Sequence, residues 1–133
     1  MILGGVIMSF QWYSKNESEG IATIYDSNIT LNKSASGFFE SAYSVMLGYD
    51  PVNNVIAIRP LTKETDNLGH IPDDKKYKIT VKPSYSRISN KMFIKSVSEE
   101  TGIMFKKSEA HKFLANWIPG EKILTISLNE EVK

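Results

Sequence analysis

Cysteine is absent from this chain of 133 residues. Its absence excludes disulfide scaffolds, zinc ribbons and thiol catalysis, and it is typical of proteins kept in a reducing compartment. Long apolar runs are also missing, since the longest, Met1–Met8, is far short of the roughly 20 residues that span a bilayer. The same run lacks the basic flank and cleavage site of a signal peptide. We therefore expect a soluble cytoplasmic protein without membrane contacts.

The run Met1–Met8 has two interpretations. It is either a flexible or pairing strand, or an extension upstream of a natural start at Met8, and of the two we expect the extension.

Motifs that carry chemistry are equally scarce. His70 and His111 are the only histidines, and they are too far apart in sequence to suggest a metal pair. No glycine-rich phosphate loop or nucleophile elbow is present. Adjacent acidic pairs such as Glu99-Glu100 point apart on a helix or strand. We therefore expect no metal, no cofactor and no catalytic activity, with both histidines at the surface.

The length suits one domain over residues 1–133, because a chain of this size can bury roughly two-thirds of its unfolded surface. Its hydrophobic share of 41% and charged share of 23% are ordinary for a globular protein. The residue pattern divides this domain into two halves, 20–61 and 77–129. A polar connector, 62–76, joins them.

The first half reads as strands followed by a short helix and a hairpin. Strands are expected at 10–13, 20–25 and 29–31, and Asn32 stands where a helix cap belongs. Alternation over 43–49 and 55–59, around the turn 50–54, predicts a hairpin that Pro60 ends.

The second half repeats this order. A strand is expected over 76–82, and Asn90 caps a helix over 91–101 that Gly102 ends. Alternation at Phe113, Ala115 and Trp117 predicts the first strand of a second hairpin.

The two halves align on each other. Asn32 matches Asn90, the segment 45–49 matches 113–117, and 56–58 matches 124–126. About ten additional residues separate helix and hairpin in the second half. We expect an α+β fold, mostly β, in which two strand-helix-hairpin halves share one core as a pseudo-twofold barrel-like or swapped-hairpin-like unit.

The segment Ile29–Phe39, followed by the hairpin Tyr43–Pro60, resembles the swapped-hairpin DNA-binding proteins of the AbrB and MraZ type. The resemblance covers residues 26–60 and, more loosely, 86–128, with Arg87 near the place of the family's usual arginine. It implies two such units in one chain and DNA binding. The same layout also resembles small uncharacterised prokaryotic proteins, which implies no known activity.

Charge is unevenly distributed along the chain. Residues 1–74 carry four basic and nine acidic side chains, whereas residues 75–112 carry ten basic and three acidic. Period-two geometry on the strand 76–82 places three lysines on one outward face, near further cations and Tyr85. We predict a nucleic-acid-binding surface here. Its candidate residues are Lys76, Lys78, Lys82, Arg87, Lys91 and Lys95.

Three alternatives stay open. In the first, the lysines form a solvated strand face or protect an edge strand from aggregation, and the basic stretch 106–112 reads as a second, solvated loop. In the second, the chain is a protein-interaction module or homodimer in which the acidic half of one copy meets the basic half of another. The least supported alternative is an enzyme with Asp26, Asp50 or a histidine in a cleft.

Overall fold

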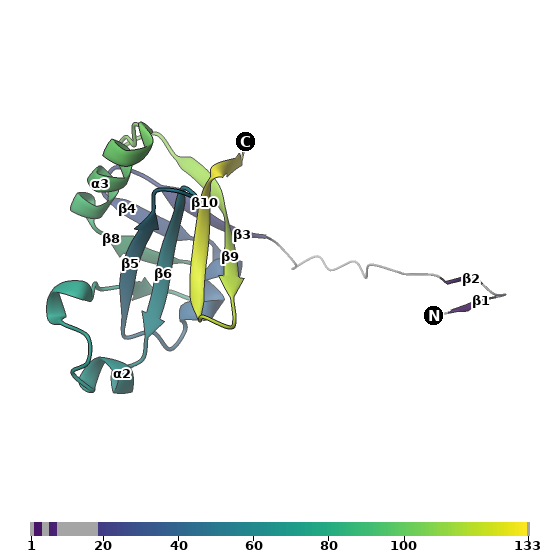
Figure 1. Ribbon diagram of the computed structural model, residues 1–133, viewed down its shortest axis with the longest axis horizontal. Coiled ribbons are helices and arrows are strands. Elements are labelled where there is room, and N and C mark those ends of the chain that lie inside the picture. Colours follow the sequence, from purple (N-terminus) through teal and green to yellow (C-terminus); the bar gives the residue numbers. More distant parts are fainter. Residues whose placement is uncertain (1, 4–5, 8–18, 133) are drawn as a thin grey trace.

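The computed structural model describes residues 2–3, 6–7 and 19–132, so the strand expected over 10–13 lies outside the described residues. Eight antiparallel strands form one sheet that curls into a half-barrel (Figure 1). Their order in the sheet is β5-β6-β10-β9-β3-β4-β8-β7. The strands are β3 (Gly20–Ile24), β4 (Asn28–Leu31), β5 (Ser44–Asp50), β6 (Val55–Leu61), β7 (Thr80–Val81), β8 (Ser86–Ser89), β9 (His111–Ile118) and β10 (Ile123–Val132). A separate two-stranded ladder joins β1 (Ile2–Leu3) and β2 (Val6–Ile7).

Short helices connect these strands and confirm the α+β, mostly β class. They are α1 (Lys33–Ser36), η1 (Gly37–Phe39), α2 (Lys63–Asn67), η2 (Asp73–Lys75) and α3 (Lys91–Thr101). The predicted bounds of α3 are confirmed: the Asn90 side chain accepts from the Phe93 amide at 3.0 Å, and Gly102 ends the helix at φ 78°.

Asn32 caps α1 and also ties it to the sheet. Its Oδ1 accepts from the backbone N–H of Ala35 at 3.1 Å and of Ile21 at 3.0 Å. Its Nδ2 donates to the carbonyl of Glu19 at 2.9 Å. One side chain therefore holds both the start of α1 and the start of β3.

We expect Asn32→Ala to lower the free energy of unfolding by about 2 kcal/mol, against about 1 kcal/mol for Asn90→Ala. Both variants lose a helix cap, but only the first also leaves the Ile21 amide and Glu19 carbonyl without these partners. Urea unfolding followed by circular dichroism measures the difference. Equal losses in the two variants would contradict the additional role of Asn32.

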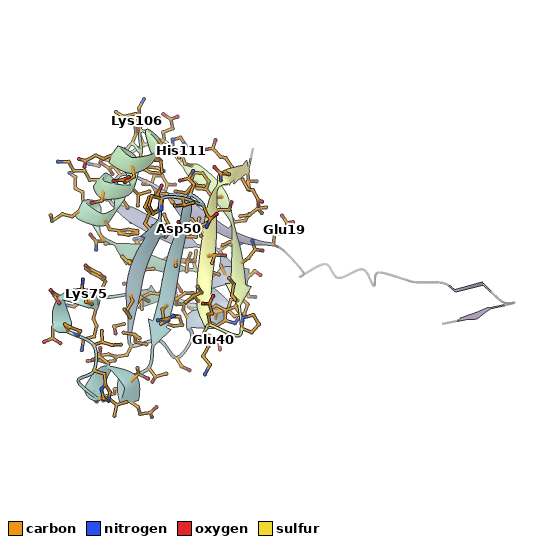
Figure 2. The ribbon with its side chains drawn as sticks, viewed as in Figure 1. Glu19, Glu40, Asp50, Lys75, Lys106 and His111 are labelled. Atoms are coloured by element: carbon orange, nitrogen blue, oxygen red, sulfur yellow. The ribbon has the colours of Figure 1, made fainter. Side chains whose placement is uncertain are left out.

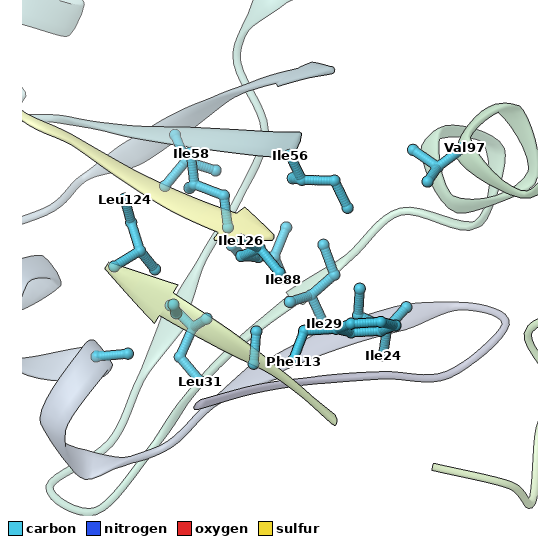
Figure 3. Close-up of a cluster of buried hydrophobic side chains, with 14 of the residues drawn as sticks. Ile24, Ile29, Leu31, Ile56, Ile58, Ile88, Val97, Phe113, Leu124 and Ile126 are labelled. Carbon is cyan, nitrogen blue, oxygen red and sulfur yellow. The ribbon is translucent and has the colours of Figure 1, made fainter. Parts of the chain in front are cut away.

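The core fills the inside of the curled sheet (Figure 3). The alternating positions of the second hairpin point inward as predicted, with Phe113, Leu124 and Ile126 fully buried. Ile94 and Val97 of α3 close the core on one side. Aliphatic side chains from both halves meet here, namely Ile24, Ile29, Leu31, Ile56, Ile58 and Ile88.

Pairs of neighbouring strands from the two halves alternate in the sheet rather than forming two lobes. β4 pairs with β8, β6 pairs with β10, and β3 pairs with β9. The two end strands approach each other as well, because Val45 of β5 and Tyr77 exchange backbone hydrogen bonds of 2.9 and 2.8 Å. Each half therefore completes the sheet of the other.

Two strand bounds differ from expectation. Pro60 does not end its strand, because β6 continues to Leu61 and the last β10 pair, Ile58 with Leu124, lies before the proline. Proline lacks a backbone N–H, and this is tolerated at Pro60 because no β10 residue pairs with it there. The strand expected over 76–82 shrinks to Thr80–Val81, since the chain pairs with β5 at Tyr77 and changes to β8 at Thr80.

Candidate functional site: a basic groove on the outer face of the sheet

Lys76 forms ion pairs with two aspartates of the connector. Its Nζ lies 3.2 Å from Asp66 Oδ1 and 3.1 Å from Asp73 Oδ1, and its side chain is only 12% exposed. The contact with Asp73, followed by those with Asp66, raises the pKa of Lys76 above its ordinary value. Lys76 therefore anchors the connector to the sheet and presents little charge to a ligand.

Ser44 joins this cluster, because its hydroxyl donates to Asp66 Oδ1 at 3.0 Å. The cluster borders a hollow of about 450 Å³. The cluster is an ion pair between Lys76 and Asp66 in which the carboxylate also accepts the Ser44 hydroxyl.

The other predicted cations are distributed over several hollows. Lys78 borders the same hollow as Lys76, whereas Lys82 borders one beside α1. Lys91 and Lys95 lie with the carboxylates of Asp26 and Glu99 around a hollow of about 280 Å³. The structure therefore does not bring all six predicted residues into one stripe.

Arg87, the remaining predicted cation, lies in a groove of about 500 Å³ together with two lysines. We call this site the basic groove. It is lined by Thr23, Tyr25, Asn28, Thr30, Arg87, Lys107 and Lys112.

A single row across four strands builds the floor of the basic groove. Lys112 of β9 pairs with Thr23 of β3, which pairs with Thr30 of β4, which pairs with Arg87 of β8. Directly paired residues share one face of a sheet. The flanking positions, such as Ile29 and Phe113, are buried inside, so this row lies on the outer face.

The loop after α3 supplies the third cation. The carbonyl of Lys106 accepts from the Asp26 amide at 3.2 Å, which fastens the loop to the β3–β4 turn. This contact places Lys107 beside the row. Figure 2 labels Lys106 at the same end of the molecule as α3.

The basic groove is electrostatically uncompensated. Among the described residues, every ion pair within 4.0 Å involves Lys76, Lys106 or His111, and none involves Arg87, Lys107 or Lys112. The Arg87 guanidinium instead lies over the Tyr85 ring, 5.5 Å from its centroid. Three cations thus face solvent on one surface beside Thr23 and Thr30, and the Thr30 hydroxyl donates to Asn28 Oδ1 at 3.2 Å. The surface is suited to binding an anion.

Sequence reasoning placed Lys107 and Lys112 in a separate, solvated loop. The outward direction of Lys112 follows from the alternation at Phe113 and Ala115, and this signal was readable. Its position beside Thr23 depends on the pairing of β9 with β3, which no local pattern encodes.

His111 is not the surface histidine that the sequence indicates. Its side chain is 19% exposed, its ring lies against those of Phe105 and Phe113, and its Nδ1 is 2.9 Å from Glu131 Oε1. The prediction of a surface position was wrong because the alternation of β9 places His111 on the inward face of the strand, together with Phe113. His70 is exposed.

Asp50, one of the acidic residues considered for catalysis, holds a backbone turn. Asp50 accepts from the amides of Val52 and Asn53 at the hairpin turn, at 2.9 and 3.2 Å. Hydrogen bonds from Asn53, its side chain foremost, lower the pKa of Asp50. The described residues contain no group of three or more histidine, aspartate or glutamate side chains that could hold a metal ion.

No family model, curated protein or solved structure matches this chain. Within the described part of the chain, no helix is long and apolar enough to cross a membrane.

Proposed function

We propose that this domain is a non-enzymatic binding or regulatory protein that binds nucleic acid through the basic groove. The observation that carries the proposal is the row from Lys112 to Arg87, with Lys107 beside it. Phosphates are bound by lysine and arginine side chains with help from hydroxyl and amide donors. The groove supplies all three kinds of donor.

The proposal changes the predicted contact set. Arg87 stays at its centre and is joined by Lys107 and Lys112. Lys91 and Lys95 carry less weight, since carboxylates share their hollow. The residue pattern that resembles swapped-hairpin DNA-binding proteins favours the same class of partner.

Charge reversal tests the proposal. We expect the double variant Arg87→Glu/Lys112→Glu to bind labelled mixed-sequence oligonucleotides at least about tenfold more weakly at low salt, because it removes two phosphate contacts. The salt dependence of the remaining binding should also become shallower. Fluorescence anisotropy over a series of salt concentrations measures both effects.

The matched control reverses two exposed lysines elsewhere, Lys63 on α2 and Lys122 in the β9–β10 turn. Lys63→Glu/Lys122→Glu changes the net charge equally but should weaken binding far less. Equal weakening in both double variants, or no binding by the unchanged protein at low salt, would overturn the proposal.

A second candidate function is a protein-interaction module or homodimer. Phe38 is 45% exposed and stacks on Trp117 with 4.7 Å between ring centroids. Ile118, the next residue on β9 and on the opposite face of the strand, is 36% exposed. Within the described residues, the β3–β9 pairing reaches Ala115 and stops two residues before Trp117. Light scattering at low and high salt tests this function, and a monomer at all concentrations and salts would remove it.

We also propose that the halves 20–61 and 77–129 are copies of one unit. Strand order supports this, because replacing β3, β4, β5 and β6 by β7, β8, β9 and β10, and the reverse, gives the same neighbours in the sheet. In this exchange the β3–β9 pair corresponds to the Val45–Tyr77 bridge, which joins β5 to the segment before β7. Register supports it as well: Leu47 pairs with Ile58 as Ala115 pairs with Ile126.

A further inference from the structure

We infer that the basic groove binds nucleic acid as a single strand and not as a duplex. The inference rests on the proposed function and adds the form of the ligand. Three features of the groove carry it: its shape, its aromatic side chains and the absence of an inserting element beside it.

The shape of the groove suits one backbone that crosses the strands. Three strand spacings separate Lys112 from Arg87, which is about 14 Å along the row. A chain that follows the row meets a cation, two hydroxyls and a second cation in turn. Thr80 of β7 pairs with Arg87 and extends the row by one further hydroxyl. A single strand is flexible enough to follow this path.

Aromatic rings lie beside the row. Tyr25 lines the groove two residues after Thr23 along the chain, and Tyr85, two residues before Arg87, lies under its guanidinium. Neither ring is fully buried. Base faces can stack on such rings only when they are not already stacked inside a duplex, so tyrosines beside cations are typical of sites for single strands.

An element that could enter a duplex is missing from the surroundings of the groove in the described structure. Duplex readers place a protruding helix or β-ribbon in the major groove. Here the cations line a hollow in the face of a sheet. The loop beside it is held to the β3–β4 turn by the hydrogen bond from the Asp26 amide to the Lys106 carbonyl and does not protrude as a separate element. The longest described helix, α3, carries Lys91 and Lys95 in its first half, but Glu99 and Glu100 near its C-terminal end repel phosphates.

The experiment compares a labelled strand about 12 nucleotides long, within the site sizes of known single-strand binders, with its duplex. We expect the unchanged protein to bind the single strand at least about tenfold more tightly than the duplex at equal salt. Tyr25→Leu and Tyr85→Leu should each weaken single-strand binding by about fivefold or more, with little effect on the duplex. Tyr25→Phe and Tyr85→Phe keep the ring and should bind like the unchanged protein.

The outcomes separate the inference from the proposed function. Duplex binding as tight as single-strand binding would overturn the inference and leave the proposed function standing. Binding of neither form would remove both. Loss of binding in the phenylalanine variants as large as in the leucine variants would also contradict stacking. Thermal unfolding by circular dichroism verifies that each variant is folded.

Discussion

Replacing Phe113 by alanine is expected to lower the free energy of unfolding by about 3–5 kcal/mol, because it removes a buried aromatic side chain and leaves a cavity. Phe113 is fully buried in the middle of β9. Its ring lies 6.5 Å from that of Phe105 and 6.4 Å from that of His111, between centroids. The substitution therefore removes contacts with the loop after α3 as well as with the sheet.

Phe38→Ala is the matched control, since it removes the same atoms from a side chain that is 45% exposed. We expect it to cost about 1 kcal/mol, mainly the stacking on Trp117. Chemical denaturation of both variants measures the difference. Similar losses would show that the second hairpin does not close the core as described.

Gly20→Ala should lower the free energy of unfolding by about 3 kcal/mol, at the upper end of the cost of overpacking. A Cβ at this position would lie 2.5 Å from the carbonyl oxygen of Ala115 in the paired strand. Backbone has to move to relieve this contact, because no flexible side chain can give way. The displacement would strain the β3–β9 pairing, which joins the two halves.

Gly48→Ala serves as the control for the same chemical change on a strand. A Cβ at Gly48 would have no atom within 4 Å, and the position has no positive φ. We expect its stability to stay within about 0.5 kcal/mol of the unchanged protein. Thermal unfolding of the two variants side by side compares them, and an unaffected Gly20→Ala protein would refute the close approach of β3 and β9.

The sequence predicted local structure well wherever a short-range pattern decides it. The cap at Asn90, the left-handed Gly102 and the alternation at Phe113 all have local causes, and each is found as expected. Lys76 shows the limit of such patterns. Its outward position followed from period-two alternation, but the connector carries Asp66 and Asp73 back to it.

The basic groove could be predicted only in part for the same reason. Arg87 and Lys112 carry recognisable charges, yet four strands that are distant in sequence bring them into one row. Pairing between strands is decided by the packing of the whole core, and a single sequence encodes it only weakly.

The interleaved order of the strands also determines when the protein can fold during its synthesis. β3 emerges from the ribosome before its partner β9, which follows almost a hundred residues later, or about 5–20 s at ordinary elongation rates. β6 likewise lacks its partner until β10 has been synthesised. Contacts this distant make closure of the sheet slow. The newly made first half therefore carries open strand edges until the last hairpin arrives, and that interval is when the chain is most exposed to aggregation.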